Sequence, residues 1–266
     1  MAADALPVTT GVLRDTRRSL LLWGIAVAAV TAIYVGFWPA MGEGADIESF
    51  IENMPEGLVQ ALGYDQIATP AGYLRSTVYG LLAPVLLLVF AIGAGARLVA
   101  GQEEDGTLEL ELTAPIARGA LLTGRLLALW ASATVLVAIV TLTALALVSA
   151  IDMDVAAGNI VAASTALWLL VLGFGTLALA VGAATGRRTV GLGVAAGAAV
   201  VAFMLDAIGP AVGADWMTAV SPFSWYLDPN PLADGFQPRG LALLAAIPVL
   251  AGVLGLVRFR GRDLMV

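Results

Sequence analysis

The chain has 266 residues, of which 60% are hydrophobic and 12% are charged, with a formal net charge of −7 and a mean hydropathy of +0.93. A soluble domain carries about 25% charged residues, so this composition excludes a soluble protein and predicts a single membrane domain over residues 1–266. Cysteine, histidine and lysine are absent. Their absence excludes Cys and His nucleophiles, thiolate or imidazole metal sites, and a P-loop lysine.

Six apolar segments are long enough, or nearly long enough, to cross a bilayer, for which about 20 residues are needed. The first apolar run has 19 residues and exceeds the roughly 7–15 of a cleavable signal, so we expect a permanent span. An even number of spans predicts both termini on one side. The segments are Leu20 to Trp38, Thr77 to Ala96, Leu126 to Ala150, Ile160 to Ala184, Val190 to Val212, and Leu241 to Val257.

The arginines are distributed very unequally between the two sides of these spans. Cytoplasmic segments of membrane proteins are enriched in basic residues, so the arginine-rich side, which holds both termini, is predicted to be cytoplasmic in a multi-pass protein of the cell membrane. Only Arg75 and Arg239 lie on the other side. The arginine-rich side carries Arg14, Arg17, Arg18, Arg97, Arg118, Arg125, Arg187, Arg188, Arg258, Arg260 and Arg262.

Three segments lie outside the spans and are expected to hold structure of their own. Residues 1–19 are polar and arginine-rich with one apolar side, which predicts an amphipathic helix along the inner surface. In the outer loop 39–76, apolar residues recur every three or four positions and predict a short surface helix. Residues 213–238 contain the aromatic sequence SPFSWY, which is typical of the membrane interface and predicts a re-entrant or interfacial loop.

A few residues inside the spans are unusual there. Pro84 lacks a backbone donor and is expected to bend the second span. Asp206, about 16 residues into the fifth span, is either a functional intramembrane acid or an interfacial carboxylate that faces water or caps the helix. Glycines four residues apart can bring helix backbones together, although an Ala/Gly-rich membrane composition accounts for them equally. These pairs are Gly182 with Gly186 and Gly193 with Gly197.

Residues 101–118, GQEEDGTLELELTAPIAR, hold five of the twenty acidic residues and lie on the predicted cytoplasmic side. The alternation of Leu and Glu over 108–112 has the period of a strand, but a lone strand has no partner beside a bilayer. A short helix is therefore expected after a turn at Gly106 and Thr107. A solvated loop is the alternative, but five acids on a positive face indicate a binding surface for a basic partner.

The stretch EEDGTLELELTAPIARGALLTGRLLA, which begins at Glu103, resembles the segment before the third span of ABC-2 type permeases, the membrane subunits of ATP-binding-cassette exporters. MPEGLVQALGY in the first outer loop and SPFSWYLDPNPLADG in the last resemble outer segments of the same family. Together the motifs cover the six spans in order. Arg125 stands where the family often has Lys, and the Leu/Glu run is less uniformly apolar than is usual in the family.

The resemblance implies an all-α membrane protein with six transmembrane helices and cytoplasmic termini, in the ABC-2 permease fold of type V exporters. A short cytoplasmic coupling helix and outer-surface helices belong to that fold. The resemblance also implies an ABC ATP-binding subunit as partner, with ATP and Mg on that subunit, no cofactor on this chain and no enzymatic activity of its own. A second permease subunit, identical or related, would complete an export pathway for hydrophobic or amphipathic compounds such as drugs, antibiotics or lipids; no nucleic acid is expected as a partner.

Site residues follow from the same resemblance. Arg14, Arg17 and Arg18 would belong to the inner-surface helix that meets the ATPase. The pathway would include Phe90, Phe203 and Asp206. The residues implied in coupling to the ATPase are Glu103, Glu104, Gly106, Thr107, Pro115 and Arg118.

Three other classes of function remain open from the residues alone. A secondary transporter would show internal repeats and polar midplane sites, and neither is clear here. An intramembrane lipid-modifying enzyme would need reactive groups, for which Asp152 and Asp154 are the one close acidic pair at an outer boundary; a tight polar loop explains them more simply. The third class is a membrane scaffold without transport activity.

Overall fold

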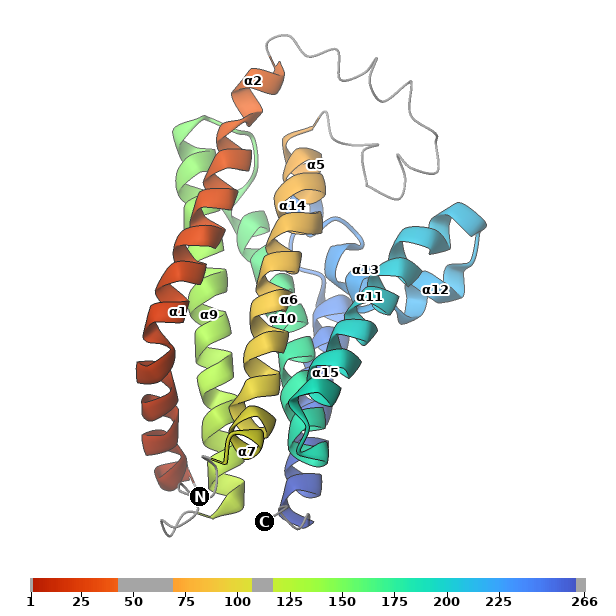
Figure 1. Ribbon diagram of the computed structural model, residues 1–266. Coiled ribbons are helices and arrows are strands. Elements are labelled where there is room, and N and C mark those ends of the chain that lie inside the picture. Colours follow the sequence, from red (N-terminus) through yellow and green to blue (C-terminus); the bar gives the residue numbers. More distant parts are fainter. Residues whose placement is uncertain (1, 43–68, 107–116, 262–266) are drawn as a thin grey trace.

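The computed structural model describes residues 2–42, 69–106 and 117–261, and every regular element in these ranges is helical. Figure 1 shows the long helices running side by side, with the start of α1 and the end of α15 at the same end of the molecule. The elements are α1 (Ala2–Gly36), α2 (Trp38–Gly42), α5 (Pro70–Leu74), η2 (Arg75–Leu82), α6 (Ala83–Ala96), η3 (Arg97–Gly101), α7 (Gln102–Glu104), α9 (Arg118–Ala150), α10 (Ala157–Thr185), α11 (Arg188–Val212), α12 (Asp215–Val220), α13 (Pro222–Leu227), α14 (Pro231–Asp234) and α15 (Pro238–Gly261).

In the part of the chain that the structure describes, six helical stretches are long and apolar enough to cross a membrane, which confirms the predicted six-span, all-α fold. Most of them extend past the apolar runs by a turn or more, because the helical backbone continues into the polar flanks. The stretches are Ala5–Ala40, Pro70–Glu104, Arg118–Ala150, Ala157–Thr185, Arg188–Val212 and Pro238–Gly261.

The N-terminal segment differs from the expected inner-surface helix, because α1 runs without a break from Ala2 to Gly36. Its first turns pack directly on α9: the Thr9 hydroxyl donates to Gly124 O at 3.0 Å. Gly124 permits this approach, since a Cβ at that position would lie 2.7 Å from Ala5 O. This packing keeps the part of α1 before Ser19 alongside α9 and in line with the rest of the helix. The surface helix expected within the first outer loop falls on residues 43–68, outside the described ranges.

The second span is an interrupted helix in which π-helical turns flank α6. Pro84 has no N–H with which to continue the α-helical hydrogen bonds. Immediately before it, Ala83 N–H bonds to Val78 O, five residues back. The widened turns of η2 therefore stand where the sequence predicted a bend, and a second π-helical segment, η3, follows α6.

The helix α10 lies at the centre of the bundle and packs against α6, α9, α11 and α15. Its glycines allow these close approaches: a Cβ on Gly175 would lie 3.0 Å from Ala91 Cβ in α6, and one on Gly173 would lie 3.1 Å from Ile247 Cγ2 in α15. Of the glycine pairs noted in the sequence, Gly182 packs against η3, where a Cβ at its position would lie 3.3 Å from Ala100 Cβ. Gly186 instead ends α10 with a φ of 70°, a conformation that favours glycine.

Three short helices, α12 to α14, form the last outer segment. The Ser221 hydroxyl caps α13 by accepting from Phe223 N–H at 3.1 Å and donates to Ala202 O in α11 at 2.8 Å. Tyr226 is buried and donates to Tyr79 O at 2.8 Å. The SPFSWY sequence therefore returns into the bundle, where Phe223 and Tyr226 are buried, whereas Trp216 in α12 is 62% exposed as expected for an interfacial residue.

Candidate transport pathway and coupling region

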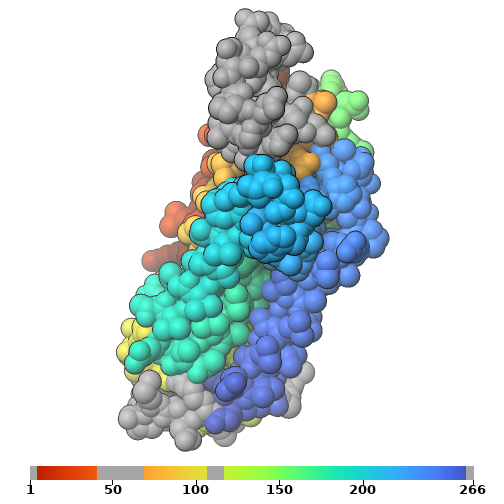
Figure 2. Space-filling view, turned by 90° about the vertical axis from the view of Figure 1, so that its right-hand side faces the viewer, coloured from red at the N-terminus to blue at the C-terminus, as the bar shows by residue number. Residues whose placement is uncertain are grey.

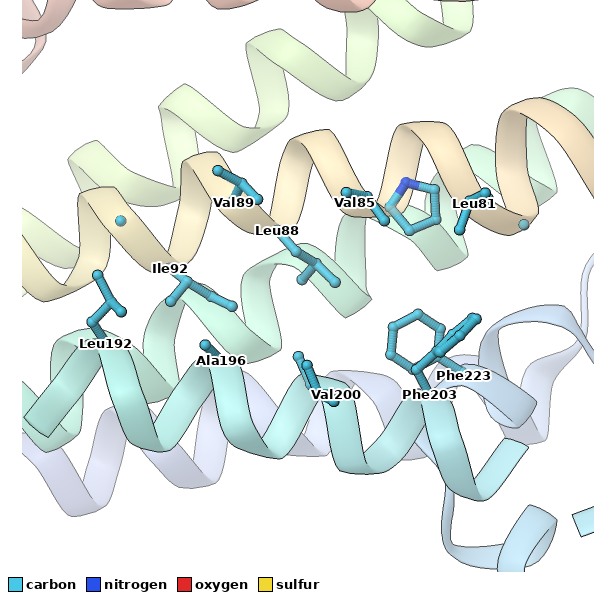
Figure 3. A pocket seen from close by; sticks show the side chains of 14 residues that line it. Leu81, Val85, Leu88, Val89, Ile92, Leu192, Ala196, Val200, Phe203 and Phe223 are labelled. Atoms are coloured by element: carbon cyan, nitrogen blue, oxygen red, sulfur yellow. The ribbon is translucent and has the colours of Figure 1, made fainter. Parts of the chain in front are cut away.

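An entirely apolar groove of about 350 Å³ separates the second span from α11. Figure 3 shows Leu88 and Ile92 of α6 facing Ala196 and Val200 of α11, with Phe203 and Phe223 closing one end. The rings of Phe203 and Phe223 meet edge to face with centroids 5.5 Å apart. The lining residues are Gly80, Leu81, Pro84, Val85, Leu88, Val89, Ile92, Gly93, Leu192, Ala196, Ala199, Val200, Phe203 and Phe223.

Small residues account for the space between the two walls. Gly93 has no atom within 4 Å of the position that a Cβ would take, and the opposite wall is lined in part by Ala196 and Ala199. On the far side of α11, Gly191 packs so closely on α10 that a Cβ would lie 2.7 Å from Ala178 O. The position of α11 is thus fixed by α10, and the groove remains because short side chains face α6.

A second cavity of about 530 Å³, lined by both polar and apolar side chains, lies toward the arginine-rich end of the bundle. Both cavities are lined by Val89 and Gly93, so they lie next to each other at this part of α6. We call this second cavity the vestibule. It is lined by Val12, Asp15, Thr16, Ser19, Trp23, Val89, Phe90, Gly93, Ala94, Arg97, Leu98, Gly101, Gln102, Glu104, Asp105 and Arg188.

The three expected pathway residues have different positions. Phe90 borders the vestibule, where its ring meets Trp23 edge to face at 5.8 Å. Phe203 borders the groove. Asp206 lines neither cavity and lies one turn beyond Phe203, beside a polar cluster in which Ser224 donates to Asp228 at 3.0 Å.

That polar cluster links three elements at the outer end of the groove. Arg75 at the start of η2 forms an ion pair with Asp228, with 2.7 Å between Nη2 and Oδ1. Asp228 directly follows α13, and α13 is bonded to α11 through Ser221. Asp206 is half-buried beside these polar and charged groups, and its role as a pathway residue or as an interfacial carboxylate stays a prediction.

The described part of the coupling element is the short helix α7 and the turn after it. The Glu104 side chain accepts a hydrogen bond from Arg188 N–H at the start of α11, at 2.8 Å. A carboxylate is stabilised at a helix N-terminus by unpaired backbone donors. Gly106 has a φ of 70°, in keeping with the expected turn, and Asp105 is exposed.

The remaining coupling candidates are only partly described. Glu103 is half-buried, next to the exposed Glu104. Arg118 begins α9. Thr107, Pro115 and the helix expected between them lie outside the described ranges, so their role stays a prediction.

The N-terminal arginines are not among the residues that surround α7 in the described part of the chain. Arg14, Arg17 and Arg18 are exposed on α1, whereas Asp15 and Thr16 on the same helix face the vestibule. Sequence reasoning missed Asp15, Arg97 and Arg188 as vestibule residues. Their charges were visible beside the spans, but only the packing of α1, η3 and α11 brings them together.

A comparison with protein families agrees with this architecture. The sequence profile of the family described as ABC-2 family transporter protein matches residues 12–264, nearly the whole chain. No curated protein is a significant match by sequence. The matched family consists of membrane subunits that work with an ATP-binding subunit on a separate chain. The chain therefore belongs to the ABC-2 transporter family, as a multi-pass permease component of an ABC transporter.

Proposed function

We propose that this permease exports hydrophobic or amphipathic compounds, and that ATP hydrolysis on a separate ATP-binding subunit drives the export. The cavities carry the proposal: an apolar groove adjoins a vestibule with polar and charged side chains, and Val89 and Gly93 line both. A compound with an apolar body and a polar end would find matching surroundings on the two sides of this junction. The permease would do no chemistry on its cargo, and ATP and Mg would bind on the partner.

A second permease subunit, identical or related, would pack on the exposed face of α11 next to the groove. Gly193 and Gly197 lie on α11 with open space at their Cβ positions, and neighbouring Val194 and Val201 are 46% and 57% exposed. Small residues on an exposed helix face allow another helix to approach closely in lipid. With a second copy across this face, two grooves would enclose one pathway.

The ATPase would act on α11 through the coupling element. The bond between Glu104 and Arg188 N–H joins α7 to the first residue of α11, and α11 is one wall of the groove. A shift of the coupling element would therefore be passed directly to the pathway. Such a shift does work only if nucleotide binding favours one arrangement of the helices over the other.

Co-purification tests this function. A partner carrying the P-loop pattern GxxxxGK[ST] should purify with the permease. Asp105→Arg should weaken that association, because it places a positive charge on the exposed end of the acidic element, whereas Asp154→Arg on the outer side should not. Glu104→Arg is less informative alone, since it also breaks the internal bond to α11. A permease that purifies without any ATPase and still moves cargo would contradict the proposal.

A further inference from the structure

The face of α1 that points away from α9 combines positive charge with exposed apolar side chains. Arg14, Arg17 and Arg18 are exposed and their spacing of three and four residues places them side by side on the helix. Directly above them Leu21 and Leu22 are 58% and 70% exposed. This side is opposite the one that bears Thr9, which packs on α9.

The height of these arginines in the membrane follows from the register between α1 and α9. Thr9 bonds to Gly124, and a Cβ on Gly24 would lie 2.9 Å from Ile139 Cδ1. Both pairs are separated by 115 positions, and Figure 1 shows the two helices running side by side in the same direction. The same register places Arg14 level with Leu129.

Continuing this register, Arg18 lies level with Ala133. The last charged residue of α9 is Arg125, and the helix is free of charge from there to its end at Ala150. At 1.5 Å per residue, Arg14 and Arg18 branch from the backbone roughly 6 and 12 Å deeper than Arg125. Their backbones therefore stand beside the apolar part of the bundle.

Arginines at this depth extend their side chains toward the membrane surface. Side chains of a helix point toward its N-terminus, and the N-terminus of α1 is at the arginine-rich end. The guanidinium groups therefore reach the zone of the lipid head groups, with Leu21, Leu22 and Ile25 beside the acyl chains. No carboxylate in the described ranges forms an ion pair with these arginines.

We propose that Arg14, Arg17 and Arg18 form a binding site for the phosphate of an anionic phospholipid, whose acyl chains lie along Leu21, Leu22 and Ile25. Arginine suits this ligand because its planar group donates two parallel hydrogen bonds to phosphate oxygens. The site replaces, for these three residues, the ATPase contact implied by the family resemblance. A soluble ATPase would meet the helix ends, whereas these arginines stand one to two turns further into the membrane.

Lipid binding to the purified permease tests the site. The relative association constant of spin-labelled phosphatidylglycerol over phosphatidylcholine would be measured for the wild type and for Arg14→Gln/Arg18→Gln. We expect a loss of about 5-fold per arginine, roughly 25-fold in total, from an attraction of ~1 kcal/mol per basic residue. Arg187→Gln/Arg258→Gln, with the same charge lost at exposed positions on the same side, should keep the preference.

Cross-linking of the wild type provides a test that needs no variant. Phosphatidylglycerol with a photoreactive head group should label peptides covering residues 12–25 more than those covering residues 188–205. An unchanged lipid preference in the double glutamine variant, or labelling spread evenly over the spans, would overturn the proposal. Loss of ATPase co-purification with an unchanged lipid preference would assign these arginines to the ATPase instead.

Discussion

The junction between groove and vestibule offers the sharpest mutational test of the pathway. Gly93 lines both cavities, and nothing lies within 4 Å of its Cβ position. Gly93→Ala should fold and transport as the wild type does, because its methyl group meets only open space. Gly93→Phe should narrow the groove, since a cavity of about 150 Å³ is the size that holds a benzene ring, and the groove measures about 350 Å³.

The expected effect depends on the size of the cargo. With roughly 200 Å³ left, small apolar compounds should still pass, while larger ones should be transported at least ~10-fold more slowly, a difference of ~1.4 kcal/mol. The assay is the initial rate of ATP-driven export of a size series of fluorescent apolar dyes in proteoliposomes containing the permease and its ATPase. Gly158→Phe is the matched control, since Gly158 also has open space around it but lies at the start of α10. Equal slowing of small and large dyes, or wild-type export of large dyes by a folded Gly93→Phe variant, would refute the assignment of the pathway.

Three further predictions concern the contacts that hold the bundle. Gly124→Ala should lower the free energy of unfolding by about 1–3 kcal/mol, because its methyl group would lie 2.7 Å from Ala5 O in the backbone of α1. Thermal unfolding in detergent, with Gly158→Ala as control, measures this loss, and an unshifted midpoint would contradict the prediction. The partly exposed ion pair between Arg75 and Asp228 should contribute at most about 1 kcal/mol to the free energy of unfolding. Arg75→Asp should therefore destabilise the protein slightly, and the charge swap Arg75→Asp/Asp228→Arg should restore most of the lost stability. A double variant no more stable than the single variant would argue against a direct contact. Trp130→Phe removes the 2.9 Å hydrogen bond from α9 to Thr176 and should cost ~1 kcal/mol, measured by the same unfolding; no change in midpoint would mean that the bond adds nothing.

Membrane composition made the six spans predictable from sequence. A helix that crosses the bilayer needs a long uninterrupted apolar segment, so the number of spans and their approximate bounds could be predicted from the sequence. Pro84 likewise marked the irregular second span, because a missing N–H has a local consequence. These features depend on the local sequence alone.

Contacts between helices could not be predicted from the local sequence. The direction of the N-terminal half of α1, alongside α9, depends on the contact of Thr9 with Gly124, which is 115 positions away in the sequence. Burial of SPFSWY depends on Tyr226 reaching Tyr79. The groove exists because Gly191 fixes α11 on α10 while small side chains face α6. Single-sequence patterns specify the faces of a helix but not the neighbour that each face meets.

The exposed face of α11 carries apolar side chains that a partner subunit would contact. In Figure 2 this side of the molecule shows α11 and the short outer helices beside α15. Val200, Val201 and Met204 on α11 are 60%, 57% and 42% exposed. These side chains lie on the helix across which we propose that the second permease subunit packs.

The dependence of transport on the separate ATPase is the most direct test of the whole account. Proteoliposomes would contain the permease alone, or the permease with its co-purified ATP-binding subunit, and export of a hydrophobic dye would be followed after addition of ATP and Mg. The account predicts export only when both chains and ATP are present. Dye movement by the permease alone, driven by an imposed ion gradient and indifferent to ATP, would contradict it and identify a secondary transporter.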